Sequence, residues 1–223
     1  MKKYKIIYDD QDLLVVCKFA GLAVQSARVS TPDLMSFLRN EMLERGEKKP
    51  YLGLVNRLDQ PVEGIVLIGK NEKAAADLSR QVTDHIHMEK WYQTVVCGKP
   101  EQREDTLVDY LLKDSRTNTS KVVKEGTPGS KRSELHYEVL ASDGEKTLLR
   151  IRLLTGRHHQ IRVQFAHAGY PLMGDTKYGR EAVAGRYCPV ALCSCRIAFI
   201  HPVTGKEMEF TIRPKGNVFT QMA

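Results

Sequence analysis

The sequence lacks any apolar run long enough to cross a membrane, and no charged leader with an apolar stretch precedes its first strand-like segment. Its five cysteines are odd in number and too few to staple a chain of 223 residues. These absences argue against a membrane protein and against a disulfide scaffold. We therefore expect a cytoplasmic protein that makes no membrane contact.

Several motifs of cofactor chemistry are also missing. The sequence has no Gly-rich phosphate loop, no dinucleotide fingerprint, no paired histidines of a zinc protease and no Gly-x-Ser-x-Gly elbow. We therefore expect chemistry that requires no nucleotide cofactor.

The cysteines near the C-terminus are a first group of potential metal ligands. Cys188, Cys193 and Cys195 cluster, and His201 could be a fourth ligand. Their spacing is not that of a zinc ribbon, and residues 192–199 have the pattern of a strand with Cys193 and Cys195 on one face. Buried structural cysteines are the favoured interpretation.

The histidines are a second group. His158, His159 and His167 could serve a zinc-dependent hydrolase together with cysteines. However, His158 is one helical turn from Arg162, and His159 is one turn from Val163, so the two histidines do not pair at i and i+4. We therefore expect no metal, and elemental analysis of the purified protein would separate the two interpretations.

The overall composition is that of a globular protein, with 42% hydrophobic and 27% charged residues. The length suits one large domain, or two halves sharing a sheet, and we expect a single domain over residues 1–223 that is a monomer. Lysine and arginine number 34 against 27 acids, a net charge of +7, which suits a polyanionic partner such as nucleic acid. Charge alone is a weak indication.

Periodicity and capping residues predict many short strands and three helices. Strands are expected at residues 6–8, 13–17, 65–68, 91–97, 136–140 and 147–154, with two more on either side of the turn at residues 201–205. The segment Thr31-Pro32-Asp33 opens the first helix, and Asn71 can cap the second. The third extends from Arg157 to about Ala168.

These elements predict an α+β fold with a mainly antiparallel central sheet flanked by helices. In the second helix, Ala75, Leu78, Val82 and Ile86 recur at helical spacing. Residues 113–131 are rich in Ser, Thr, Gly and Lys, which indicates an exposed and mobile loop.

The triplet Arg57-Leu58-Asp59 stands just before the apolar segment 65–68. An aspartate there is either part of a surface ion pair or a carboxylate held by an arginine at the floor of a cleft. From the Arg-x-Asp pattern alone, the surface ion pair is the commoner case. The third helix offers Arg162 on its polar face.

Three motifs together resemble the RluA-like family of pseudouridine synthases. They occur in the family's order: PYLGLVNRLD at residues 50–59, KWY at 90–92, and TGRHHQIRV at 155–163 followed by GDTKYG at 174–179. The similarity extends from Tyr8 to Phe210. It implies the pseudouridine synthase catalytic fold with an active-site cleft, an isomerase activity without cofactor, and a ribosomal or transfer RNA substrate.

The resemblance also implies roles for individual residues. Asp59 matches the catalytic aspartate, which acts either as a nucleophile on the sugar or as a base at C2′. Tyr92 matches the aromatic that stacks on the target base and is placed to help remove its C5 proton. Arg162 matches the basic residue that pairs with the catalytic carboxylate. Arg57 matches the arginine that contacts RNA where the target nucleotide leaves its stack.

The chain departs from the family pattern at two places. It has Asn56 where members commonly carry His, and Val62-Glu63-Gly64 where they carry Thr-Ser-Gly. Glu63 adds an acid near a site that approaches phosphate, so RNA specificity or local geometry is expected to differ. No S4-like RNA-binding module is expected before the first hairpin, so RNA affinity must come from the catalytic domain.

An alternative of another class is a catalytically silent RNA-binding protein with the same fold. The intact Asp59, Tyr92 and Arg162 argue against it. Pseudouridine formation by the wild type and by Asp59→Asn distinguishes the two.

Overall fold

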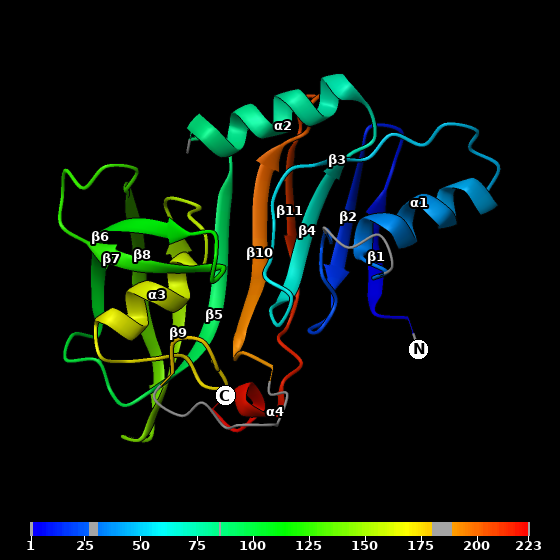
Figure 1. Ribbon diagram of the computed structural model, residues 1–223. Coiled ribbons are helices and arrows are strands. Elements are labelled where there is room, and N and C mark those ends of the chain that lie inside the picture. The colour runs from blue at the N-terminus through cyan, green and yellow to red at the C-terminus, as the bar shows by residue number, and fades with distance from the viewer. Residues whose placement is uncertain (1, 27–30, 85, 180–188, 223) are drawn as a thin grey trace. The chain divides into compact units, whose positions relative to one another are not determined.

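The computed structural model describes residues 2–26, 31–84, 86–179 and 189–222. The chain divides into two compact units (Figure 1). The first unit comprises residues 1–89 and 194–213, and the second comprises residues 90–193 and 214–223.

The first unit is built on antiparallel strands with two helices. Its elements are β1 (Tyr4–Asp9), β2 (Leu13–Lys18), α1 (Leu34–Glu44), β3 (Gly53–Leu54), β4 (Glu63–Gly69), α2 (Glu72–Asp84), β11 (Glu207–Thr211) and, from Ser194 on, β10 (Leu192–Ile200). Strands β1, β2, β4 and β10 are successive neighbours, β3 also pairs with β4, and β11 pairs with β10. The β1–β2, β2–β4, β3–β4 and β10–β11 pairs are all antiparallel.

The two helices of this unit cover opposite faces of its strands. Alternate residues of β2 point to opposite sides, and all six are buried. Leu13 and Val15 pack with Leu78 of α2. Leu14 faces Leu38 of α1 on the other side.

Capping chemistry sets the ends of these helices largely as predicted. Asp33 is the N-cap of α1 and forms a capping box with Ser36. Asn71 Oδ1 accepts the N–H of Ala74 at 2.8 Å, so Asn71 caps α2. The prediction for Ile86 was wrong: α2 ends at Asp84, whose carboxylate accepts the N–H of Ile86, and the Ile86 side chain is 78% exposed.

The second unit is a twisted antiparallel sheet with one longer helix. Its elements are β5 (Glu89–Cys97, from Lys90 on), β6 (Glu104–Asp114), β7 (Thr119–Val123), β8 (Lys131–Ser142), β9 (Lys146–Leu153), α3 (Gln160–His167) and α4 (Asn217–Thr220). The strand order is β5-β9-β8-β6-β7, and every pair is antiparallel. Tyr137 of β8 meets Phe165 edge-on, with ring centroids 5.5 Å apart, so α3 covers the face that carries Tyr137.

Two sequence predictions in this unit need correction. Residues 113–131 are not one loop, because β6 continues to Asp114 and β7 pairs with it from Thr119, with Ser120 buried. Helix α3 begins at Gln160 rather than at Arg157. The Gln160 side chain accepts the N–H of Arg157 and the hydroxyl of Thr155, and these bonds hold the preceding segment outside the helix.

The α+β class with antiparallel pairing is confirmed within each unit. Cys193 and Cys195 alternate along β10 and are both buried, as predicted, whereas Cys188 lies outside the described residues. None of the described helices is long and apolar enough to span a membrane.

Candidate active site

The four predicted site residues belong to two different units. Arg57 and Asp59 lie in the first unit, on the segment between β3 and β4, and Tyr92 and Arg162 lie in the second, on β5 and α3. Arg57 is exposed, whereas Asp59 is half-buried. The Asp59 carboxylate is therefore partly shielded from solvent, whereas the Arg57 guanidinium is accessible.

Asn56 fixes the start of the Asp59 segment. Its side-chain amide donates to the carbonyl of Ile65 at 3.0 Å and accepts the N–H of Leu67 at 2.7 Å, so it binds to β4 as another strand would. Asn56 is buried, and an amide can make both bonds at once. The departure from histidine therefore has a structural role here: Asn56 anchors the residues that precede Asp59.

A buried lysine fixes the other side of Asp59. The Lys18 side chain at the end of β2 has 0% exposure, and its ammonium donates to carbonyl groups of two loops. The acceptors are the carbonyls of Phe19 (3.3 Å), Leu22 (2.8 Å), Gln60 (3.3 Å) and Val62 (2.5 Å). Because the N–H of Val62 also donates to the carbonyl of Asp59, Lys18 holds the turn that carries the carboxylate. No pattern in the sequence distinguished Lys18 from the exposed lysines.

Burial lowers the pKa of Lys18 from 10.5 to about 8, although the charges of Asp59, Cys17 and Glu63 oppose the shift. Between these two values the unfolded chain binds the proton that the folded chain has lost, so this group makes stability rise with pH. We expect the unfolding free energy of the wild type, relative to Lys18→Met, to rise by about 3 kcal/mol from pH 7 to pH 10.5. Denaturant unfolding of both proteins across this range measures it.

Asp59→Asn provides the internal control for that measurement. Since the charge of Asp59 raises the Lys18 pKa, its removal is expected to move the Lys18 titration to lower pH, as followed by NMR of the Lys18 side chain. A pH-independent difference between wild type and Lys18→Met would contradict the assignment.

In the second unit, Tyr92 lies on the face of the sheet that α3 covers. Tyr92 pairs with Ile151, and Ile151 pairs with Tyr137, which contacts α3 through Phe165. The Tyr92 side chain is 6% exposed.

Arg162 is held by a pairing that the sequence analysis did not assign. Its Nε donates to Asp175 Oδ2 at 2.7 Å and its Nη2 to Asp175 Oδ1 at 2.8 Å, a side-on bidentate geometry, and both side chains are buried. The guanidinium also lies over the ring of Tyr178, 5.2 Å from its centroid. The motif at residues 174–179 thus orients Arg162.

The adjacent histidines are engaged with hydroxyl groups. His158 Nδ1 lies 2.9 Å from Ser120 Oγ, and His159 Nδ1 lies 2.7 Å from the hydroxyl of Tyr178. The two imidazole rings stack with their centroids 3.7 Å apart. His159 occupies the N-cap position of α3 without a side-chain capping hydrogen bond, and its positive φ of 55° is a strained conformation for a non-glycine residue. This arrangement ties the start of α3 to β7.

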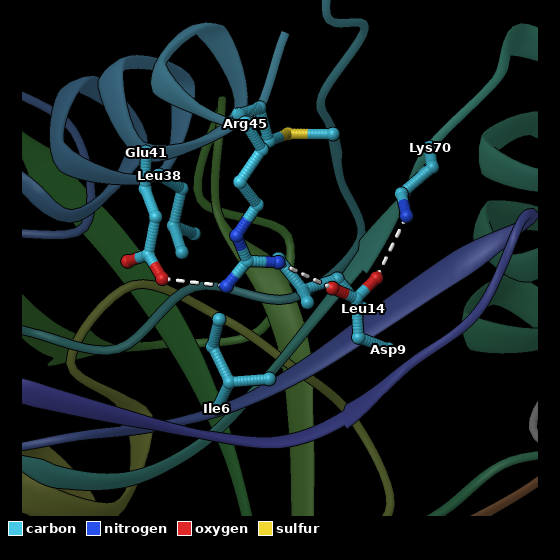
Figure 2. Close-up of a pocket in the computed structure, with 8 residues that line it drawn as sticks. Ile6, Asp9, Leu14, Leu38, Glu41, Arg45 and Lys70 are labelled. Carbon is cyan, nitrogen blue, oxygen red and sulfur yellow. Dashed lines mark hydrogen bonds and ion pairs between the residues drawn. The ribbon is translucent and has the colours of Figure 1, made fainter. Parts of the chain in front are cut away.

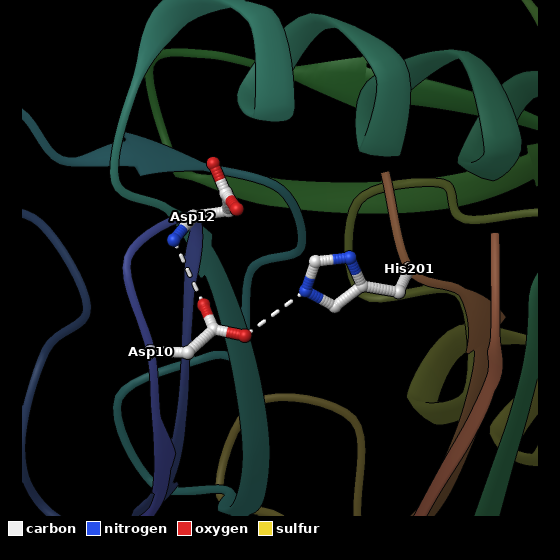
Figure 3. A group of neighbouring side chains, drawn as sticks. All are labelled: Asp10, Asp12 and His201. Carbon is white, nitrogen blue, oxygen red and sulfur yellow. Dashed lines mark hydrogen bonds and ion pairs between the residues drawn. The ribbon is translucent and has the colours of Figure 1, made fainter. Parts of the chain in front are cut away.

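One group of metal-ligand side chains gathers within the described ranges: Asp10, Asp12 and His201 in the first unit (Figure 3). His201 Nδ1 accepts the N–H groups of Val203 and Thr204, so the ring proton is on Nε2 and is donated to Asp10 Oδ2 at 2.9 Å. Burial raises the pKa of Asp10, but hydrogen bonds, chiefly from the Leu13 N–H and His201, outweigh it and lower the pKa to about 2. The cluster joins two turns. The atoms of Asp10, Asp12 and His201 that could bind a metal take part in hydrogen bonds within the protein.

A pocket between α1 and the first hairpin is lined by charged side chains that pair with one another (Figure 2). Arg45 pairs with Asp9 at 3.0 Å and with Glu41 at 2.6 Å, and Lys70 pairs with Asp9 at 2.7 Å. These contacts hold α1 against the first hairpin. Each charged side chain that lines the pocket therefore has an ion-pair partner in the lining itself.

Comparison with known proteins decides the family. The family model described as RNA pseudouridylate synthase matches residues 12–167. The chain belongs to the RNA pseudouridylate synthase family. It is 31% identical over 222 residues to ribosomal large subunit pseudouridine synthase D of Zymomonas mobilis, an alignment that covers 92% of this chain and 68% of the relative.

Other relatives agree with this assignment. The RNA pseudouridine synthase YlyB of Bacillus subtilis is 32% identical over 210 residues, which cover 92% of this chain and 67% of that protein. Among solved structures, human RNA pseudouridylate synthase domain containing 4 matches with a TM-score of 0.78 at 20% identity, covering 96% of this chain and 90% of that one. The chain therefore has the pseudouridine synthase fold and is an isomerase of this family that acts on RNA.

Proposed function

We propose that this pseudouridine synthase isomerises a specific uridine in structured ribosomal or transfer RNA, with Asp59 as the catalytic carboxylate. The proposal rests above all on Asp59: this half-buried aspartate lies on a turn fixed by Asn56 on one side and by Lys18 on the other. Such fixation is what a carboxylate needs to meet a sugar carbon or a C2′ proton in one defined geometry.

The reaction breaks the bond between N1 of uracil and C1′ of ribose, turns the base, and joins C5 to C1′. The C5 proton is then lost, and N1 ends protonated, so no oxidant, reductant or second substrate is consumed. We propose that Tyr92 supports the extruded base, that Arg57 contacts the strand from which it leaves, and that Arg162 supplies positive charge at the site. Asp59 acts either as the nucleophile at C1′ or as the base at C2′.

The distribution of charge supports RNA binding. The second unit carries 18 Lys and Arg residues against 12 Asp and Glu residues, whereas the first carries 16 against 15. Most of the net charge of +7 therefore belongs to the unit that contains Tyr92 and Arg162, where it can attract phosphates over a distance. We propose that both units together, residues 1–223, form one monomeric catalytic domain that works in the cytoplasm without a cofactor.

The RNA target can be identified by mapping pseudouridines in a strain that lacks the gene. The relative from Zymomonas mobilis is named for the large ribosomal subunit, which makes large-subunit ribosomal RNA our first expectation. Pseudouridines mapped across all RNAs of a deletion strain should lack one or a few modifications, and these should return with the wild-type gene but not with Asp59→Asn. An unchanged map in the deletion strain would contradict the proposed function.

A further inference from the structure

Lys90 is a largely buried lysine whose ammonium group reaches solvent and has no counter-charge among the described residues. Its side chain is only 5% exposed, yet no described residue accepts a hydrogen bond or forms an ion pair with its ammonium group. Burial alone lowers the pKa of Lys90, and no acidic neighbour opposes the shift. Because the Nζ atom of Lys90 is not fully buried, the ammonium group reaches solvent in the free protein and an anion can approach it from outside.

The position of Lys90 relates it to Tyr92. Lys90, Tyr92 and Thr94 alternate along β5 and are all buried, so they share the face of the sheet that α3 covers. Residues two apart on a strand are separated by about 7 Å. One nucleotide can therefore place its base against Tyr92 and a neighbouring phosphate near Lys90.

Space is available beside the ammonium at Gly156. A Cβ atom added at Gly156 would have one neighbour within 4 Å, the Nζ of Lys90 at 3.8 Å. The missing side chain thus leaves a gap bordered by the cation and by the backbone of the Thr155-Gly156-Arg157 turn. A phosphate oxygen in this gap would meet a charge-assisted donor.

We infer that Lys90 binds an RNA phosphate next to the target uridine, in the gap left by Gly156. The identity of the RNA rests on the proposed function, but the contact itself is a phosphate–ammonium pair and is tested by binding alone. Lys90 is then a substrate-binding residue whose largely desolvated ammonium group gains a counter-charge when RNA binds.

The test compares Lys90→Met with wild type, using labelled dodecauridylate as the probe. We expect about tenfold weaker binding at moderate salt and a salt-dependence slope smaller by about 0.7, the value for one lost phosphate contact with single-stranded RNA. Lys73→Met, the same change at an exposed lysine of α2, should bind as wild type does. Gly156→Ala, which narrows the gap without changing charge, should also weaken binding.

Stability separates this role from a structural one. Because Lys90→Met replaces a largely desolvated charge by an apolar chain of similar length, we expect its melting temperature to equal or exceed that of wild type. Wild-type affinity and slope in Lys90→Met would overturn the inference, as would loss of binding together with loss of stability. Dodecauridylate binding by a wild type that makes no pseudouridine in any RNA would contradict only the proposed function.

Discussion

Replacing Asp175 by asparagine is expected to lower the free energy of unfolding by about 3–5 kcal/mol. Asp175 and Arg162 are both almost fully buried, and the carboxylate accepts two guanidinium N–H groups as well as the backbone N–H groups of Lys177 and Tyr178. Asparagine keeps the shape but removes the charge that compensates the buried guanidinium. Denaturant unfolding at neutral pH measures the difference.

A matched control comes from an exposed pair in the same unit. Arg150 and Glu138 also form an ion pair, but their side chains are 48% and 42% exposed, so Glu138→Gln should cost less than about 1 kcal/mol. Equal small effects of Asp175→Asn and Glu138→Gln would show that the buried pair does not hold Arg162.

The pH dependence of the Asp175 effect has a defined sign. Burial raises the pKa of Asp175, but the hydrogen bond and charge of Arg162 outweigh it and hold the pKa below the ordinary value. The contribution is therefore complete at neutral pH and is lost as the pH falls through that lowered pKa. The stability difference between wild type and Asp175→Asn should shrink in acid.

Local signals in the sequence predicted the parts of the fold that depend on neighbouring residues. The first hairpin follows from two apolar runs about Asp10, whose side chain accepts the N–H groups of Asp12 and Leu13 in the turn. The starts of α1 and α2 follow from Asp33 and Asn71. These features need no distant partner.

The errors arose where a distant or a side-chain contact decides the structure. The polar residues of β7 gave a loop pattern, but pairing with β6 and burial of Ser120 make a strand. The start of α3 depends on the Gln160 side chain, which periodicity does not report.

The candidate site likewise has features that the sequence predicted and features that depend on contacts between distant residues. Motif similarity identified Asp59, Tyr92 and Arg162 as residues of interest, but apart from an expected pairing of Arg162 with the catalytic carboxylate it did not indicate which groups hold them. Lys18 reads as an ordinary strand-end lysine, and only tertiary burial reveals its contacts with the turn after Asp59. Asp175 stood in a quoted motif without a role until its pairing with Arg162 was seen.

Asp59→Asn is expected to reduce pseudouridine formation by about a thousandfold or more, the range in which loss of a nucleophile or general base falls. Asparagine retains the shape of the side chain, and the turn remains anchored by Asn56 and by the carbonyl contacts of Lys18. RNA affinity and folding should therefore stay near wild type. The loss should appear in the rate of the chemical step.

Glu63→Gln is the matched control for this change. Glu63 is also an acid close enough to influence Lys18, and it lies only four residues from Asp59. If the effect of Asp59→Asn came from the altered charge around Lys18 rather than from chemistry, Glu63→Gln should lose activity to a similar degree. We expect it to remain within a few-fold of wild type.

The most direct measurement is single-turnover pseudouridine formation in total RNA from the deletion strain, with wild type, Asp59→Asn and Glu63→Gln compared at saturating enzyme. We expect the wild type and Glu63→Gln to convert the target uridine and Asp59→Asn to leave it unconverted while still binding the RNA. Conversion by Asp59→Asn at the wild-type rate would contradict the assignment of Asp59 as the catalytic carboxylate.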